Sequence, residues 1–220
     1  MNSCMIVIVD YGVGNLRSVQ KMFEKSGATA LISADPDTIA AADGIVLPGV
    51  GAFSDAMENL HKLALVEFLR EQALERRKPI LGISLGMQLF ARNSNEGGLN
   101  SGLGIIEAEV ELLDVSKHRD WADKKLTLPH IGWNEVQPAP ESRLFDGIAG
   151  GTDFYFVHSY HVRCENKADV AAWCEFGNDF ACAIENDNVF ATQFHPEKSQ
   201  SGGIQLINNY VALCGGATCL

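Results

Sequence analysis

Two short motifs, far apart in the chain, carry residue types that could perform nucleophilic chemistry. The first is Gly82-Ile-Ser-Leu-Gly86, in which a glycine stands two places on either side of Ser84. This pattern is typical of a strand that turns sharply into a helix and holds the central side chain where developing negative charge is favoured. The second is His195-Pro-Glu197, which follows an apolar segment. A base oriented by a carboxylate is the general arrangement that activates a nucleophile.

Each motif also has an ordinary structural interpretation, because a serine often caps a helix and a histidine can be part of a core. The segment Pro48-Gly-Val-Gly51 could aim backbone N–H groups at an oxyanion, or it could be only a loop before a helix. The segment Asp10-Tyr-Gly-Val-Gly-Asn15 lacks both the spacing of a dinucleotide-binding loop and the lysine of a P-loop. It therefore favours a tight strand-to-helix turn over nucleotide binding.

The elements that must position these motifs follow from hydrophobic periodicity. Short continuous apolar runs, typical of buried parallel strands, occupy residues 5–9, 28–32, 44–47 and 80–83. Helical patterns follow them at 16–25, 56–63, 66–76 and 85–92, and a glycine-rich loop is expected over 93–104. The second half is rich in strands, at 106–112, 152–161, 170–176, 180–185 and 189–194, before a closing helix at 204–213. We expect an α/β fold with a mainly parallel open sheet flanked by helices, formed by one domain over residues 1–220.

Composition narrows the classes of function. The chain is 46% hydrophobic and 20% charged, as an ordinary globular protein is, and its net charge of −11 disfavours a nucleic-acid partner. The apolar run Met5–Val9 is too short for a signal peptide, and no run approaches the roughly 20 residues of a membrane span. We therefore expect a cytoplasmic protein with no membrane partner. The six cysteines contain no C-x-x-C pair, so buried thiols are expected in place of a metal site or disulfides.

Taken together, the motifs resemble the class I, or triad, glutamine amidotransferase family, from Met5 to about Val211. In that family an elbow like Gly82–Gly86 holds the nucleophile. A loop like Pro48–Gly51 supplies the amides that bind the oxyanion, and a segment like His195–Glu197 completes the catalytic triad. Three further motifs, Asp10–Leu16, Pro129-His-Ile-Gly-Trp-Asn134 and Val157-His-Ser-Tyr160, are most similar to one branch of the family. That branch supplies ammonia to a (β/α)8-barrel cyclase in histidine biosynthesis.

The resemblance implies hydrolysis of glutamine to glutamate and ammonia, without a cofactor, in a heterodimer with the barrel cyclase. The residues that it assigns to catalysis are Ser84, His195 and Glu197, with the oxyanion held by Gly49, Val50, Gly51 and Leu85. The residues that it assigns to glutamine binding are Gly51, Gln88, Ser159 and Tyr160. Those that it assigns to the partner interface are Asn15, Tyr155 and Lys198.

One position departs from the family pattern, because the family nucleophile is cysteine and this chain has Ser84. A thiol, with an ordinary pKa of about 8.5, becomes a nucleophilic thiolate far more readily than a hydroxyl loses its proton. We therefore expect the chain to be inactive or strongly impaired as a glutaminase. Because His195, Glu197 and Gln88 are all retained, a substitution that slows turnover explains the serine better than gradual decay of the site.

Three alternatives stay open on the sequence alone. The chain could be a non-catalytic pseudo-glutaminase that only docks on its barrel, or a glutaminase that feeds a sugar-amidinating synthase. It could also be a serine esterase, since Gly82–Gly86 satisfies G-x-S-x-G. Against the esterase, the acidic residue follows the histidine, and the chain has no His-Gly-Gly-Gly loop.

Overall fold

Five parallel strands form the half of the sheet that carries the elbow. The protein is described from a computed structural model that covers residues 4–119 and 123–215. The strands are β1 (Met5–Val9), β2 (Thr29–Ser33), β3 (Gly44–Gly49), β4 (Ile80–Ser84) and β13 (Val189–Thr192). Their order across the sheet is β2-β1-β3-β4-β13. The middle strands are buried on both faces, which explains why they read as continuous apolar runs in the sequence.

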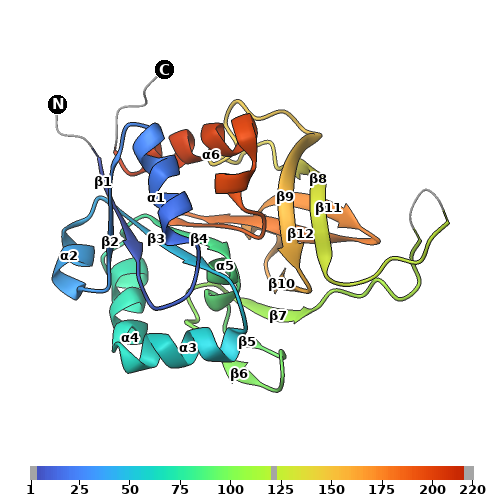
Figure 1. The fold of residues 1–220 in the computed structure, drawn as a ribbon, viewed down its shortest axis with the longest axis horizontal. Coiled ribbons are helices and arrows are strands. Elements are labelled where there is room, and N and C mark those ends of the chain that lie inside the picture. The colour runs from blue at the N-terminus through green and yellow to red at the C-terminus, as the bar shows by residue number, and fades with distance from the viewer. Residues whose placement is uncertain (1–3, 120–122, 216–220) are drawn as a thin grey trace.

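Helices cover both faces of these parallel strands (Figure 1). One face is covered by α1 (Leu16–Lys25) and α6 (Gln200–Leu213), which bury Phe23 and Leu206 against Ile6 and Ile8 of β1. The other face is covered by α2 (Pro36–Ala41), α3 (Phe53–Lys62), α4 (Leu65–Arg70) with a π-helical turn at Glu71–Glu75, and α5 (Leu85–Leu89). Successive residues of a strand point to opposite faces, so each strand contributes to both hydrophobic cores.

The remaining strands extend the same sheet, mostly in antiparallel pairs. Next to β13 lie β12 (Asn178–Asn186), β10 (Tyr160–Cys164) and β7 (Ala108–Leu112), followed by the short strands β5 (Asn93–Ser94) and β6 (Asn100–Ser101). A branch from β12 continues through β11 (Val170–Phe176), β8 (His130–Pro138) and β9 (Thr152–His158). Two 3-10 turns, Lys167–Asp169 and Pro196–Lys198, complete the elements.

The predicted α/β architecture, with a parallel first half and a strand-rich second half, is confirmed, and the predicted bounds of α1 coincide with those observed. Several details differ, and the helix α2 was not predicted. The segment 152–161 forms two strands, separated at Ser159, and the loop expected over 93–104 contains the paired strands β5 and β6. The helix α5 ends at Leu89 because the carbonyls of Leu89 and Phe90 accept hydrogen bonds from Leu103 and Ile105, both at 2.8 Å. Of the charged segment 117–125, residues 120–122 lie outside the described residues.

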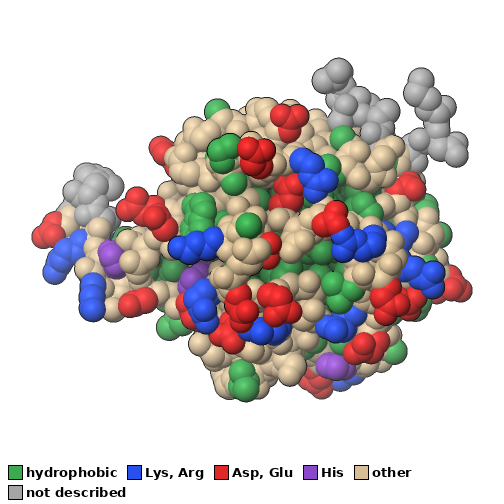
Figure 2. Space-filling model, turned by 180° about the vertical axis from the view of Figure 1, so that it is seen from behind, with side chains coloured by type: hydrophobic (Ala, Val, Ile, Leu, Met, Phe, Trp, Pro, Cys, Tyr) green, Lys and Arg blue, Asp and Glu red, His purple; other side chains and the backbone are tan. Residues whose placement is uncertain are grey.

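Acidic and basic side chains are interleaved over the face shown in Figure 2. The ion pairs of the structure include those of Arg163, which contacts Glu109 at 2.7 Å and Glu111 at 3.1 Å, and of Arg92, which contacts Glu107 at 3.1 Å. Among the residues that the structure describes, no helix combines the length and the apolar character needed to cross a bilayer. The five described cysteines are free thiols, and Cys219 lies outside the described residues.

Candidate active site

Ser84 occupies a sharp turn between β4 and α5, with φ of 57° and ψ of −111°. A positive φ is uncommon for a residue with a side chain, so the surrounding structure must hold it. The flanking glycines explain how it does so. A Cβ on Gly82 would lie 2.8 Å from the carbonyl carbon of Gly86, and a Cβ on Gly86 would overlap the carbonyl oxygen of Leu47. The close packing of α5 on β3 and β4 therefore requires glycine at both positions.

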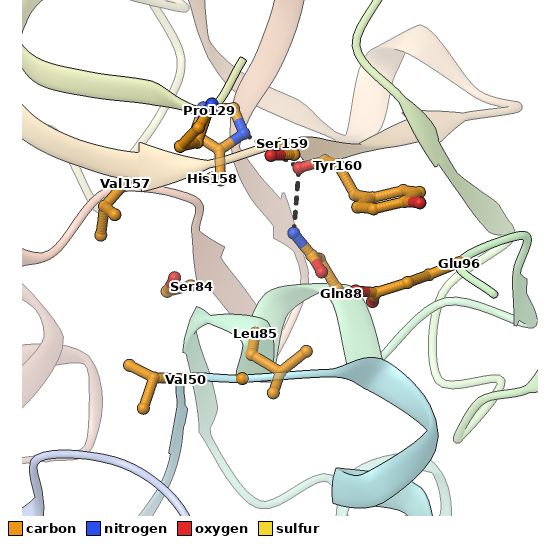
Figure 3. A pocket seen from close by; sticks show the side chains of 11 residues that line it. Val50, Ser84, Leu85, Gln88, Glu96, Pro129, Val157, His158, Ser159 and Tyr160 are labelled. Atoms are coloured by element: carbon orange, nitrogen blue, oxygen red, sulfur yellow. Dashed lines mark hydrogen bonds between the residues drawn. The ribbon is translucent and has the colours of Figure 1, made fainter.

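Ser84 lines a cavity of about 350 Å³ at the carboxyl ends of the parallel strands (Figure 3). In an α/β sheet, this is the edge at which ligands bind. Three of the lining segments come from regions singled out in the sequence: Val50 and Gly51, Leu85 and Gln88, and Val157–Tyr160. Pro129, the first residue of another motif quoted from the sequence, and Glu96 complete the lining.

His195 and Glu197 follow β13, the parallel neighbour of β4. Thr192 pairs with Ile83, so the chain leaves both strands at the same edge of the sheet. The N–H of His195 donates to the Tyr155 carbonyl at 2.9 Å, and its Nδ1 lies 2.8 Å from Oε1 of Glu197. A carboxylate accepts, so Nδ1 carries the proton and Nε2 presents a lone pair. Among the described residues, this buried Nε2 has no hydrogen-bond partner.

The loop at the end of β3 borders the same cavity. The Pro48 carbonyl accepts a 2.7 Å hydrogen bond from the buried Tyr11 hydroxyl, and Gly49 packs so closely that a Cβ there would lie 2.9 Å from Cβ of Leu85. Beyond this fixed point, Gly51 adopts φ of 106° with open space around it, and the Val50 side chain is exposed. The loop is therefore anchored at Gly49 and free of close packing at Gly51.

Gln88 is held with its amide in one orientation. Its Nε2 donates to the Tyr160 carbonyl and to Oε1 of Gln193, each at 3.0 Å, which leaves Gln88 Oε1 as an acceptor. In Figure 3 the Gln88 side chain reaches up toward Ser159 and Tyr160, across the cavity from Val50. These residues, assigned to glutamine by resemblance, are thus brought together with Ser84 around one cavity.

Glu96 is a cavity residue that the sequence analysis missed. It comes from the turn between β5 and β6, and its Oε2 accepts a 3.0 Å hydrogen bond from the Phe53 N–H at the start of α3. The Ser94 hydroxyl accepts the Glu96 N–H at 3.1 Å, and the Asn100 amide donates to the Glu96 carbonyl at 2.8 Å. Nothing in a glycine-rich segment signals such a fixed carboxylate. Among the described residues that line the cavity, Glu96 is the one carboxylate.

Two of the three predicted interface residues lie side by side. The Nζ of Lys198 sits 5.3 Å from the centre of the Tyr155 ring, and the ring of Trp133, itself 46% exposed, contacts Tyr155 edge-on at 6.0 Å. Asn15 is exposed at the start of α1, the helix that packs against the 3-10 turn containing Lys198.

Comparison with known proteins identifies the family of this chain. Residues 7–212 match the class-I glutamine amidotransferase family, and the chain belongs to that family. Within it, the chain is similar to imidazole glycerol phosphate synthase subunit HisH 1 of Campylobacter jejuni (strain RM1221), with 46% identity over 209 residues, 95% of this chain and 100% of that protein. It is also 45% identical to HisH of Moorella thermoacetica over 205 residues, 93% of each chain. The structure of PurLQS from Thermotoga maritima shares the fold, with a TM-score of 0.72 at 17% identity, covering 96% of this chain and 99% of that one.

Proposed function

We propose that this chain is a HisH-type glutaminase subunit of an imidazole glycerol phosphate synthase, folded as one glutaminase domain that acts in the cytoplasm. It supplies ammonia from glutamine to a HisF-type (β/α)8-barrel cyclase in histidine biosynthesis. The observation that carries the proposal is that Ser84, at a strained turn on β4, and the buried His195–Glu197 pair follow neighbouring parallel strands at the same edge of the sheet. The cavity of about 350 Å³ suits a ligand the size of a free amino acid.

In the proposed reaction, the nucleophile at position 84 attacks the carbon of the glutamine side-chain amide. His195 Nε2 accepts the nucleophile's proton and donates it to the nitrogen as the C–N bond breaks and ammonia leaves. The backbone N–H groups of Leu85 and the Gly49–Gly51 loop stabilise the oxyanion of the tetrahedral intermediate. Water then hydrolyses the γ-glutamyl enzyme and releases glutamate.

The amino-acid end of glutamine is bound by residues that this chain retains. Gln88 Oε1 and the Glu96 carboxylate both suit an ammonium group, since each is an acceptor held in place by other hydrogen bonds. Gly51, Ser159 and Tyr160 provide polar backbone and hydroxyl groups for the carboxylate. Binding therefore survives the change of nucleophile, whereas turnover does not, because a serine hydroxyl is much harder to activate than a thiol.

The partner surface in this proposal is formed by Asn15, Tyr155 and Lys198, with the exposed Trp133 ring next to Tyr155. A barrel seated there covers the mouth of the cavity and keeps ammonia from solvent. Docking also aims the amides of the loosely packed Val50–Gly51 segment, so the isolated subunit has little activity even with cysteine at position 84.

The test compares the chain with its Ser84→Cys variant, each reconstituted with the cyclase at matched concentration. We expect the variant to turn over glutamine at least about 10³-fold faster, a barrier difference of about 4 kcal/mol. Cyclase activity with ammonium salt serves as the control and stays equal in both complexes. Equal glutamine-dependent rates would identify Ser84 as a competent nucleophile. A Ser84→Cys complex that stays silent with glutamine would favour the pseudo-glutaminase.

A further inference from the structure

Two buried histidines lie behind the cavity and take no part in the chemistry proposed above. His130 on β8 and His158 on β9 are partners in the antiparallel register of these strands. The His130 ring is stacked between Phe156 and Phe176, with ring centres 4.8 Å and 4.0 Å away. His158 lines the glutamine cavity, whereas His130 and Asn134 line a second cavity of about 690 Å³ between β8 and β11.

The hydrogen bonds of these residues fix both tautomers. The Tyr160 carbonyl lies 2.9 Å from Nδ1 of His158 and can only accept, so this nitrogen carries a proton. Burial lowers the pKa of His158 to about 3, so the ring is neutral at pH 7 and its Nε2 is an acceptor. His130 Nδ1, 3.0 Å away, must therefore donate to it. Burial likewise lowers the pKa of His130 to about 4, which leaves its Nε2 to accept from Asn134 Nδ2 at 3.4 Å.

Both ends of this chain of hydrogen bonds are anchored. Asn134 also donates to the Glu175 carbonyl at 2.8 Å, and its Oδ1 accepts the Glu135 N–H at 3.0 Å, so its amide cannot flip. At the other end, the Tyr160 carbonyl accepts from His158 and from Gln88 Nε2, which fills both of its lone pairs.

We infer that Asn134, His130 and His158 form a hydrogen-bonded relay that positions the Tyr160 carbonyl and, through it, the Gln88 side chain for glutamine. The inference rests on the proposed function, and His130 acts in it as a positioning residue. Without the His130 donor, Nε2 of His158 is a buried acceptor with no partner, and the ring must turn to find another donor. This movement weakens the Nδ1–H hydrogen bond to the Tyr160 oxygen and releases the carbonyl that orients Gln88.

Nuclear magnetic resonance of the full 15N-labelled chain tests the relay without any ligand. Long-range 1H–15N correlation at pH 7 is expected to identify both His130 and His158 as Nδ1–H tautomers. His130→Phe keeps an aromatic ring between Phe156 and Phe176 but removes the donor. We expect this variant to shift the ring-nitrogen resonances of His158 and the side-chain amide resonances of Gln88.

Two further variants separate positioning from packing. His130→Asn offers an amide N–H near the place of Nδ1 and is expected to restore both signals. His161→Phe replaces a mostly buried histidine on β10 that lies outside the relay and whose ring contacts Phe180. It is the matched control and should leave the His158 and Gln88 signals unchanged. Thermal melting checks that each variant is folded.

Calorimetric titration with glutamine measures the consequence for binding. His130→Phe is expected to weaken binding about tenfold, as loss of one buried hydrogen bond does, with His130→Asn and His161→Phe near the unsubstituted chain. An Nε2–H tautomer at either histidine, or an unchanged Gln88 amide in His130→Phe, would overturn the relay. If the unsubstituted chain has the expected tautomers but binds no glutamine, the proposed function fails and the relay stands.

Discussion

His195 and Glu197 are joined by a 2.8 Å contact between Nδ1 and Oε1, although each side chain is only 3% exposed. Burying a carboxylate is costly unless a partner donates a hydrogen bond to it or carries a positive charge. The contact therefore holds the imidazole in the tautomer that presents Nε2, and in the proposed reaction it would also stabilise the imidazolium that forms when Nε2 takes a proton.

Replacing this carboxylate is expected to slow the chemistry more than it weakens binding. In the Ser84→Cys complex, Glu197→Gln should lower kcat for glutamine hydrolysis by about 10²-fold or more, because the amide holds the ring but cannot balance its charge. The KM for glutamine should change little. Glu165→Gln, which alters an exposed carboxylate paired with Arg92, is the control and should leave both constants unchanged. Steady-state kinetics that show an unchanged kcat for Glu197→Gln would exclude this role.

Glu96 is expected to act on binding alone. Glu96→Gln keeps the side-chain shape and an oxygen for the Phe53 N–H but removes the negative charge that faces an ammonium group. A charge-assisted hydrogen bond contributes about 1.5–3 kcal/mol, so the Kd for glutamine should rise by roughly 10- to 100-fold. In the Ser84→Cys complex, KM should rise in the same proportion while kcat is kept. A fall in kcat at constant KM would show that Glu96 acts elsewhere.

Gly86 is expected to tolerate no side chain. A Cβ there would overlap the Leu47 carbonyl oxygen, so Gly86→Ala must push α5 away from β3. We expect a loss of about 2 kcal/mol or more in the free energy of unfolding, measured by urea denaturation. The matched control is Gly150→Ala, whose nearest neighbour is the end of the Gln137 side chain. Equal stability of the two variants would refute the close packing of the elbow.

Stability is expected to fall on mild acidification because of the two relay histidines. Burial lowers the pKa of His130 to about 4 and that of His158 to about 3, whereas the unfolded chain has the ordinary value of 6.5. Between these values the unfolded state binds more protons, so the free energy of unfolding falls as the pH drops below about 6.5. Each histidine contributes up to about 1.4 kcal/mol per pH unit.

Urea denaturation at pH 7 and pH 5 measures this effect. His130→Asn carries no titrating group at that position and should lose less stability between the two pH values than the unsubstituted chain. The same loss in both proteins would show that His130 does not contribute.

The local sequence pattern was sufficient to predict those elements whose own residues determine their conformation. The helix α1 was predictable from the helical spacing of its apolar residues, of which Val19 and Phe23 are buried. The elbow was predictable from its two glycines, because a sharp turn from strand to helix leaves no room for a side chain at either position. The helix α2 also has a local signal that the analysis overlooked, because Asp35 caps it through the Thr38 N–H at 2.9 Å and Pro36 occupies its first position.

Other features depend on partners distant in the sequence. The strand β5 exists because Asn93 and Ser94 pair with β6 and with β7, and the three fixed contacts of Glu96 come with that pairing. The relay has the same origin, since His130 and His158 meet only through the register of β8 and β9. Periodicity within one segment carries no information about such meetings, which is why these residues entered the candidate site only with the structure.

The position of β13 between β4 and β12 determines when, during folding, the two halves of the site come together. During synthesis the elbow strand β4 emerges well before β13, the strand that leads to His195, and β13 must insert beside a strand made about a hundred residues earlier. Non-local pairing of this kind forms late in folding. A partly folded chain in which β13 has not yet paired therefore has the elbow at Ser84 without His195 and Glu197 beside it.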